Sequence, residues 1–216
     1  MLIITGGNLN SDFSLDFIKK NNFKTIISVD SATQFCFDNK IFPNYIIGDM
    51  DSLKNKSLLK NNFFEKSKII KLNPVKDLTD THYALNFAIS LKPKKIYILG
   101  ASGTRLDHTL SNINILVNTL ENNIETFIID KNSKLCLINK KKTYKLNKKE
   151  AFGKFLSILP FTDEISGVTI NGAKYNLNNA SLLKKDSIGI SNEFCDNDYI
   201  TIKINSGIAI IIESKD

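Results

Sequence analysis

The stretch Tyr45-Ile-Ile-Gly-Asp-Met-Asp-Ser52 places a short apolar run directly before a glycine and two carboxylates. The run is partly β-branched and is therefore predicted to be a buried strand that ends at Gly48. Asp49 and Asp51 follow, and Ser52 is suited to cap a helix. Because neighbouring acids repel each other, a cation is expected between them, and Mg²⁺ is a common partner of hard oxygen ligands. An acidic turn before a capped helix is the alternative, and this stretch alone does not decide between the two.

Strand and helix patterns alternate on both sides of this stretch, from residue 2 to residue 129. The clearest helix has apolar residues spaced by four and three between Leu106 and Leu120. Such alternation predicts βαβ units and a mostly parallel, Rossmann-like sheet, in which ligands bind outside the carboxyl ends of the strands. The other expected strands are residues 2–5, 25–29, 68–72, 95–99 and 125–129, and further helices are expected from a cap at Ser11, over 32–38 and around 84–89.

After Asp130 the helical patterns stop and short β-type runs replace them. Residues 199–204 alternate between apolar and polar side chains, and Asn205-Ser-Gly207 is predicted to join them to the last strand as a hairpin. We therefore expect an α/β domain over 1–132 and an all-β sandwich or barrel domain over 133–216. The remaining short runs are 134–138, 154–159, 168–170, 187–190 and 208–212.

The composition is that of an ordinary globular protein, with 42% hydrophobic and 24% charged residues. No apolar run is long enough to cross a membrane, and the first residues lack the basic segment of a signal peptide. The three cysteines show neither zinc spacing nor a disulfide framework, so a cytoplasmic location is expected. The net charge of +7 comes from scattered basic residues without interleaved aromatics. This pattern argues against nucleic acid as a partner and suits an anionic ligand such as a polyphosphate.

Two further strands are also followed by charged residues at the expected start of a helix. Lys76-Asp-Leu-Thr-Asp80 follows one strand, and Gly100-Ala-Ser-Gly-Thr-Arg-Leu-Asp-His108 follows another. The intervals from Asp49 to Asp77 and on to Asp107 are 28 and 30 residues, about the length of a βαβ unit. The three loops are therefore predicted to meet at one edge of the sheet. Taken singly, each has a structural alternative, because acids stabilise helix N-termini and an Arg–Asp pair can be a surface ion pair.

Carboxylates, glycine turns and basic side chains in one place favour a metal-bound polyphosphate as the ligand. Mg²⁺ prefers one or two carboxylates together with phosphate oxygens, and glycine turns supply backbone N–H groups for phosphate. Lys76 and Arg105 are suited to neutralise the charge that develops during phosphoryl transfer. The chain has neither a GxxxxGK[ST] loop nor a GxGxxG motif, which argues against a P-loop enzyme and an ordinary dinucleotide-binding protein.

These motifs resemble, in order and spacing, those of the thiamine pyrophosphokinase family, and the resemblance covers nearly the whole chain. It implies transfer of the pyrophosphoryl group of ATP to the hydroxyl of thiamine, with Mg²⁺ as the cofactor and thiamine diphosphate and AMP as products. It also implies a homodimer in which thiamine lies between the α/β domain of one subunit and the β domain of the other. The segments that carry the resemblance are 48–52, 76–80, 103–108, 172–177 and 189–194, together with Asp30 and Asn112.

The resemblance also implies roles for individual residues. Asp49, Asp51 and Asp77 would hold Mg²⁺ and, with Arg105, would form the catalytic centre. Ser191 and Asn192 would hold thiamine. The nucleotide pocket would be lined by Asp30, Lys76, Asp80, Arg105, Asp107 and His108.

Two features depart from the family pattern. Bacterial members usually have two glycines before the arginine, whereas the second position here is Thr104. The chain contains no tryptophan, so stacking on thiamine would fall to another ring, with Tyr175 and Phe194 as candidates. Two alternatives keep the site but change the function: transfer to another small alcohol such as a pterin, or a nucleotide-sensing module without catalysis.

Overall fold

In the computed structural model the described residues are 1–51, 53, 58–59, 61–103 and 105–216. They divide into two compact units, Met1–Lys131 and Asn132–Asp216. The predicted helix cap at Ser52 and the effect of Thr104 on its loop lie outside the described residues.

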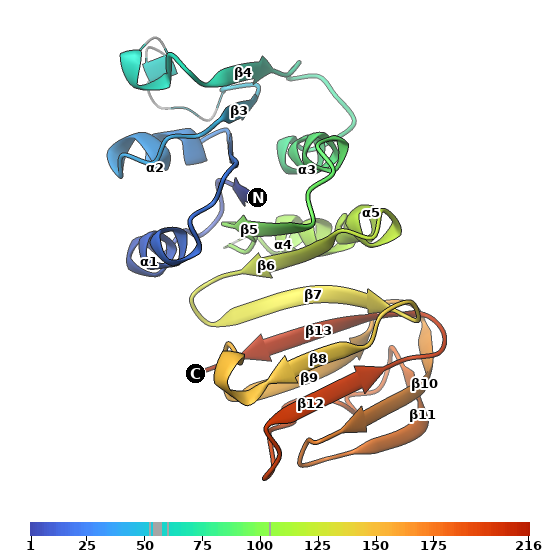
Figure 1. Cartoon of the computed structure of the whole chain (residues 1–216). Coiled ribbons are helices and arrows are strands. Elements are labelled where there is room, and N and C mark those ends of the chain that lie inside the picture. The colour runs from blue at the N-terminus through green and yellow to red at the C-terminus, as the bar shows by residue number, and fades with distance from the viewer. Residues whose placement is uncertain (52, 54–57, 60, 104) are drawn as a thin grey trace. The chain divides into compact units, whose positions relative to one another are not determined.

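The first unit is built on a parallel sheet (Figure 1). Its strands are β1 (Leu2–Ile4), β2 (Ile26–Val29), β3 (Tyr45–Gly48), β4 (Lys68–Lys71), β5 (Lys95–Leu99) and β6 (Glu125–Ile129). They lie in the order β4-β3-β2-β1-β5-β6, and neighbouring strands pair in parallel. The chain moves outward from β1 to β4 and then returns to place β5 on the other side of β1. The strand order therefore reverses between β1 and β5, which is where ligands bind in doubly wound sheets.

The apolar runs of the sequence form the buried centre of this sheet. Ile46 and Ile47 are fully buried in β3, as predicted for the run before Gly48, and β1 and β2 are buried along their whole length. Helices on both sides of a parallel sheet require such continuous apolar strands. The edge strand β4 instead carries exposed Lys68 and Lys71, which discourage pairing with a further strand.

Helices fill most connections between these strands. They are α1 (Ser11–Asn21), α2 (Ala32–Asp38), α3 (Asp80–Ser90), α4 (Leu106–Asn114) and α5 (Leu116–Glu121), with a 3-10 turn, η2 (Asn62–Phe64). The cap of α1 is Asn10 rather than Ser11, because Phe13 N donates to Asn10 Oδ1 at 3.0 Å. The helix predicted through Leu120 is divided at Ile115, where Asn118 N bonds to Ile115 O in the tighter 3-10 pattern. In the described part of the chain, no helix has both the length and the apolar composition needed to span a membrane.

The second unit is all-β, and its pairings are antiparallel. Its strands are β7 (Ser133–Asn139), β8 (Tyr144–Asn147), β9 (Phe155–Pro160), β10 (Glu164–Asn171), β11 (Leu177–Leu183), β12 (Tyr199–Lys203) and β13 (Ile208–Ser214), with a 3-10 turn, η3 (Lys148–Glu150). β13 pairs with β7 and β9, while a second sheet has the order β11-β10-β12-β8. The predicted fold class, an α/β domain followed by an all-β domain, is confirmed.

Some local predictions for the second unit are wrong. β12 pairs with β10 and β8, whereas β13 pairs with β7 and β9. Residues 205–207 therefore connect two sheets rather than form a hairpin. Residues 187–190 form no strand, and Gly189 has a left-handed φ of 97° there. Strand β11 was not predicted, because a bulge with Asn179 at φ 48° interrupts its alternation of side chains.

Candidate functional site

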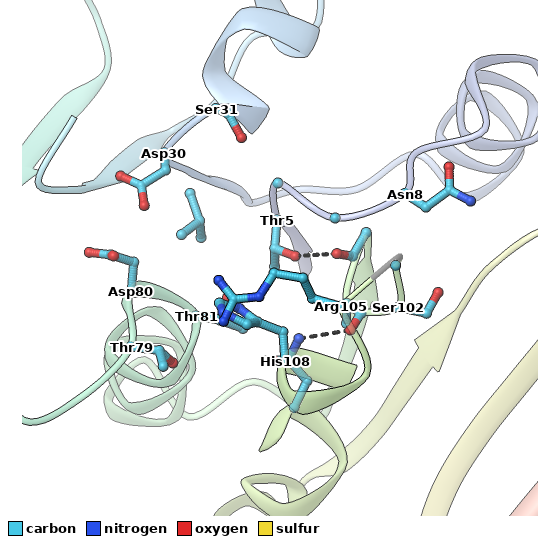
Figure 2. Close-up of a pocket in the computed structure, with 17 residues that line it drawn as sticks. Thr5, Asn8, Asp30, Ser31, Thr79, Asp80, Thr81, Ser102, Arg105 and His108 are labelled. Carbon is cyan, nitrogen blue, oxygen red and sulfur yellow. Dashed lines mark hydrogen bonds between the residues drawn. The ribbon is translucent and has the colours of Figure 1, made fainter. Parts of the chain in front are cut away.

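A pocket of about 530 Å³ lies at the switch point of the first unit. Its walls come from the loops after β1 (Thr5–Asn8) and β5 (Gly100–Gly103), from the end of β2, and from the first turns of α3 and α4. Figure 2 shows Asp30 and Asp80 together at one side of this space, with Arg105 and His108 reaching it from the start of α4. Acidic and basic groups therefore border the same cavity, at the sheet edge where the sequence predicts them.

The two glycine-bearing loops lie against each other. Gly7 N donates to Gly100 O at 2.9 Å, and Asn8 N donates to Ser102 O at 2.8 Å. A Cβ atom on Gly7 would overlap the Gly100 carbonyl oxygen, so only glycine allows this approach. The loops thus present backbone, rather than bulky side chains, to one wall of the pocket.

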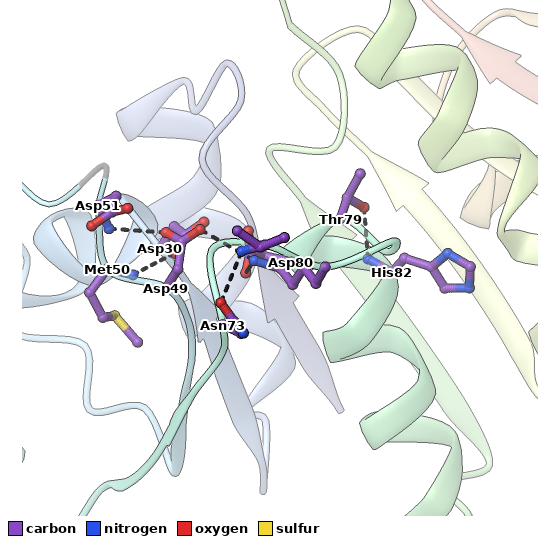
Figure 3. A network of polar contacts seen from close by, with 10 residues as sticks. Asp30, Asp49, Met50, Asp51, Asn73, Thr79, Asp80 and His82 are labelled. Carbon is purple, nitrogen blue, oxygen red and sulfur yellow. Dashed lines mark hydrogen bonds and ion pairs between the residues drawn. The ribbon is translucent and has the colours of Figure 1, made fainter.

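Three carboxylates gather beside the pocket, from three different strand or helix ends. Asp30 follows β2, Asp49 follows β3, and Asp80 begins α3. One oxygen of each lies within 4.8 Å of the others (Figure 3). Parallel strands end at a common sheet edge, so residues distant in sequence meet there.

Local backbone geometry brings Asp30 into this cluster. Asp30 itself has a left-handed φ of 47°, and its Oδ1 accepts a hydrogen bond from Met50 N at 3.3 Å. Gly48 leaves room for the carboxylate, because a Cβ atom there would overlap Asp30 Oδ1. Gly48 therefore has two roles: it forms the turn before the two acids, and it allows Asp30, which follows β2, to approach the end of β3.

The cluster crowds negative charge into a partly buried space. Burial raises the pKa of Asp30 from 3.8 to about 7, and the carboxylates of Asp80 and Asp49 contribute to the rise. Lys76 balances part of the charge, because its Nζ lies 3.2 Å from Asp49 Oδ2 and 3.0 Å from Asp80 Oδ1. The remaining negative charge favours a proton or a cation.

The donor set fits a divalent cation. Asp80 Oδ1 is buried, and Lys76 Nζ lies 3.0 Å from it. A carboxylate oxygen has more than one acceptor site, so this oxygen is able to accept a further ligand beside Lys76. Carboxylate oxygens are the ligands that Mg²⁺ prefers in proteins. Asp30, Asp49 and Asp80 are thus the described residues best placed to share one.

Asp51 and Asp77 lie outside the cluster of three. Asp51 N donates to Asp49 Oδ1 at 3.0 Å, so the two acids of the opening motif are linked through the backbone of the turn. Asp77 is exposed in the loop before α3. Their assignment as metal ligands stays a prediction. The structure instead places Asp30 and Asp80, which the family resemblance assigned only to the nucleotide pocket, in the cluster with Asp49.

Arg105 and His108 line the pocket, and Asp107 holds Arg105. Arg105 Nε donates to Asp107 Oδ1 at 3.2 Å, and both side chains are about two-thirds exposed. The hydrogen bond from Arg105 lowers the pKa of Asp107. The guanidinium is therefore held at the pocket mouth by a surface partner that a phosphate group is able to replace.

In the second unit, the predicted thiamine residues differ in their surroundings. Asn192 is buried: its Nδ2 donates to Tyr175 O at 2.7 Å, and its Oδ1 accepts from Tyr175 N at 3.0 Å. Ser191 has a left-handed φ of 55°, and its N–H donates to Ser157 Oγ at 3.0 Å. Of the two candidate rings, Tyr175 is well exposed and Phe194 is half-buried.

Several pocket residues were not assigned from the sequence. Thr5 and Asn8 come from the loop after β1, Ser31 follows Asp30, and Thr81 lies in the first turn of α3. The available signal was Gly6-Gly7 directly after a buried strand, which matches the glycines after β5. Two adjacent glycines alone are common in turns, so the signal becomes specific only when β1 and β5 are known to be neighbours.

Comparisons with known proteins point to one family. The family model described as "Thiamin pyrophosphokinase, catalytic domain" matches residues 19–128, and "Thiamin pyrophosphokinase, vitamin B1 binding domain" matches residues 143–209. The chain is 32% identical over 197 residues to a protein of Bacillus subtilis named "Thiamine pyrophosphokinase", covering 88% of this chain and 87% of that protein.

Solved structures show the same likeness. The crystal structure of thiamine pyrophosphokinase from Bacillus subtilis has a TM-score of 0.86 and 29% identity, covering 100% of this chain and 98% of that chain. The crystal structure of thiamin pyrophosphokinase from Geobacillus thermodenitrificans has a TM-score of 0.85 and 25% identity, with coverages of 100% and 97%.

Proposed function

The chain belongs to the thiamin pyrophosphokinase family and is an enzyme that transfers a pyrophosphoryl group to thiamine, and we propose that ATP binds in the switch-point pocket as the donor of this group. The pyrophosphoryl group would pass to the thiamine hydroxyl, leaving AMP. The observation that carries this assignment is the cluster of Asp30, Asp49 and Asp80, because Asp30 and Asp80 line the same pocket as Arg105. Such a pocket suits a polyphosphate bound through a divalent cation.

Positioning and charge neutralisation would supply most of the rate in this transfer. Mg²⁺, when bound to the carboxylates, would neutralise negative charge on the phosphate oxygens. Arg105 would leave Asp107 to bind the phosphate chain, and Lys76 would keep the carboxylates of Asp49 and Asp80 together. The thiamine hydroxyl would attack the β-phosphorus in line with the bond to the leaving AMP, and the hydroxyl proton would go to a carboxylate of this edge.

The remaining assignments rest on the family resemblance. These are Asp51 and Asp77 as further metal ligands, and Ser191 and Asn192 as residues of the thiamine site. The resemblance also supports a homodimer that completes the thiamine site, and a cytoplasmic enzyme agrees with the absence of a disulfide among Cys36, Cys136 and Cys195, which all lie in the described residues. Sedimentation of the purified protein with and without both substrates tests the dimer.

The decisive experiment is incubation of the purified protein with ATP, Mg²⁺ and thiamine, with chromatography of all products. Thiamine diphosphate and AMP in equal amounts are expected. Release of ADP would show transfer of a single phosphoryl group instead, and turnover only with a hydroxymethyl pterin would change the acceptor. Tight binding of ATP–Mg²⁺ without turnover on any acceptor would favour a nucleotide sensor.

A further inference from the structure

Two buried side chains hold the turn formed by Gly100–Gly103. Thr5 Oγ1 donates to Gly100 O at 2.6 Å, and Asn112 Nδ2 donates to Ala101 O at 2.7 Å (Figure 2). Thr5 is 3% exposed and Asn112 is 7% exposed, and both border the pocket. The two hydrogen bonds are therefore shielded from bulk water and act on neighbouring peptide units of one pocket wall.

Backbone donors complete the hold on this turn. Gly7 N also donates to Gly100 O, and Asn8 N donates to Ser102 O. The carbonyl groups of three consecutive residues, 100 to 102, thus all accept hydrogen bonds from the loop after β1 or from α4. In a trans peptide the N–H points opposite to the C=O. Fixing these carbonyls therefore fixes the direction of the N–H groups of Ala101, Ser102 and Gly103.

Those three N–H groups donate to no acceptor in the described part of the chain. They belong to residues that line the pocket, and the turn begins at Gly100 with a left-handed φ of 72°. Successive backbone N–H groups of this kind favour anions, and they act best when the protein holds them in place beforehand. The turn is therefore a rigid set of donors beside Arg105.

We propose that Thr5 and Asn112 are positioning residues, which hold the 100–103 turn so that its backbone N–H groups bind the phosphate oxygens of the nucleotide. The inference rests on the proposed function, because it takes ATP as the ligand of this pocket. Neither side chain has to touch the reacting atoms. Loss of either hydrogen bond would let a peptide unit rotate and would weaken nucleotide binding more than the chemical step.

The test compares Thr5→Val and Asn112→Leu with wild type. Thr5→Val keeps the side-chain shape and removes only the hydroxyl donor. Thr119→Val is the matched control, because Thr119 Oγ1 donates to Leu116 O at 2.8 Å, is 1% exposed and lies outside the pocket lining. The KM values for ATP and thiamine, kcat, the Kd of ATP without thiamine, and the melting temperature are measured for each.

In Thr5→Val, the KM and Kd for ATP should rise about 10-fold, which corresponds to ~1.4 kcal/mol, or about one hydrogen bond. The KM for thiamine and kcat should stay within about twofold, as expected when uniform binding is lost. Thr119→Val should lower the melting temperature without changing the KM for ATP, and Thr5→Ser should restore wild-type values. Because both residues act on one turn, the double variant should raise the KM for ATP by less than the product of the single effects.

An unchanged KM for ATP in Thr5→Val, or equal rises in the KM values for ATP and thiamine, would overturn the proposal. Tripolyphosphate, used as a competitor of ATP, separates the two ends of the nucleotide. Its inhibition constant should rise by the same factor as the KM for ATP, and an unchanged constant would mean that the turn binds the nucleoside instead. If wild type forms no thiamine diphosphate, the proposed function is contradicted. The Kd of ATP for wild type and Thr5→Val, measured without thiamine, would still test whether Thr5 positions the 100–103 turn.

Discussion

Lys76 Nζ lies 3.2 Å from Asp49 Oδ2, an ion pair that joins two loops 27 residues apart in the sequence. The two side chains are 17% and 18% exposed, so water screens the pair only partly. The same ammonium group reaches Asp80, on the other side of the carboxylate cluster. Lys76 therefore reduces the repulsion between the carboxylates of Asp49 and Asp80 before any metal cation binds.

Replacement of Lys76 by methionine should destabilise the protein in the absence of metal. The variant keeps most of the side-chain volume but removes the ammonium group that Lys76 places beside Asp49 and Asp80. Mg²⁺ binds only the folded state and therefore stabilises it. In Lys76→Met it no longer competes with the ammonium group for the carboxylates, so it should raise the melting temperature of the variant more than that of wild type. Thermal unfolding in EDTA and in Mg²⁺ measures this difference, with Lys71→Met on the exposed edge of β4 as control. Equal Mg²⁺ shifts in all three proteins would separate Lys76 from the cation site.

Asp49→Asn should lower turnover by at least about 100-fold, or ~2.7 kcal/mol in transition-state stabilisation. The structural reason is the position of Asp49 in the cluster with Asp30 and Asp80. The family resemblance predicts the same loss for Asp51→Asn, although Asp51 lies outside that cluster. Initial rates at saturating Mg²⁺ check both, with the exposed Asp12→Asn in α1 as control. Near-normal turnover of Asp51→Asn would restrict the catalytic carboxylates to the clustered ones.

The fold and the general place of the site could be predicted because both follow from simple patterns. A buried run such as Tyr45–Ile47 followed by charged residues marks a strand end, and alternation with helices makes the sheet parallel. Strand ends of a parallel sheet share an edge, so Asp49 and Arg105 were expected near one pocket. The comparisons confirm the family to which these motifs were assigned.

The membership of the acidic cluster could not be predicted, because it depends on individual backbone angles and contacts. Asp30 joins it through a left-handed φ of 47° and the space left by Gly48, and neither is visible as a sequence period. In the second unit, β12 alternates as expected, but alternation does not say which strand it pairs with. Pairing partners depend on contacts distant in sequence, which explains the wrong hairpin at 205–207.

Arg105→Ala should reduce turnover without affecting the stability of the fold. The side chain is 68% exposed and its ion-pair partner is the similarly accessible Asp107, so its loss leaves no buried group unpaired. Loss of the guanidinium removes a charge from the phosphate end of the pocket, and a 10- to 1000-fold loss, about 1.4 to 4 kcal/mol, is expected. Kinetics and thermal unfolding are measured together. Unchanged kinetics would mark Arg105 as an ordinary surface residue, and a lower melting temperature would contradict the structural argument.

The raised pKa of Asp30 should make the metal-free protein less stable as pH increases. Burial, with the charges of Asp80 and Asp49, raises this pKa from 3.8 to about 7. Between these values folded Asp30 keeps a proton that the unfolded chain has released, so the free energy of unfolding falls as pH rises through that window. Asp30→Asn cannot ionise, so its melting temperature in EDTA should fall less than that of wild type between about pH 4 and about pH 8. Parallel pH profiles for the two proteins would contradict the assignment of the shift to Asp30.

Asn192→Ala should destabilise the second unit as well as weaken thiamine binding. The side chain is 4% exposed, and its hydrogen bonds engage both the N–H and the C=O of Tyr175. Truncation leaves these backbone groups without partners, which costs about 1–3 kcal/mol in the free energy of unfolding. The KM for thiamine should also rise, because the loop that carries the exposed Tyr175 ring loses its anchor.

Ser191→Ala is the matched variant, because it removes only a hydroxyl from the neighbouring position and should leave the free energy of unfolding within about 0.5 kcal/mol of wild type. Urea unfolding and the KM for thiamine are measured for both variants. A rise in KM for Asn192→Ala at unchanged stability would assign its amide to direct contact with thiamine. A rise in KM that accompanies the loss of stability, together with a KM effect of Ser191→Ala on its own, would give Asn192 the structural role and Ser191 the binding role.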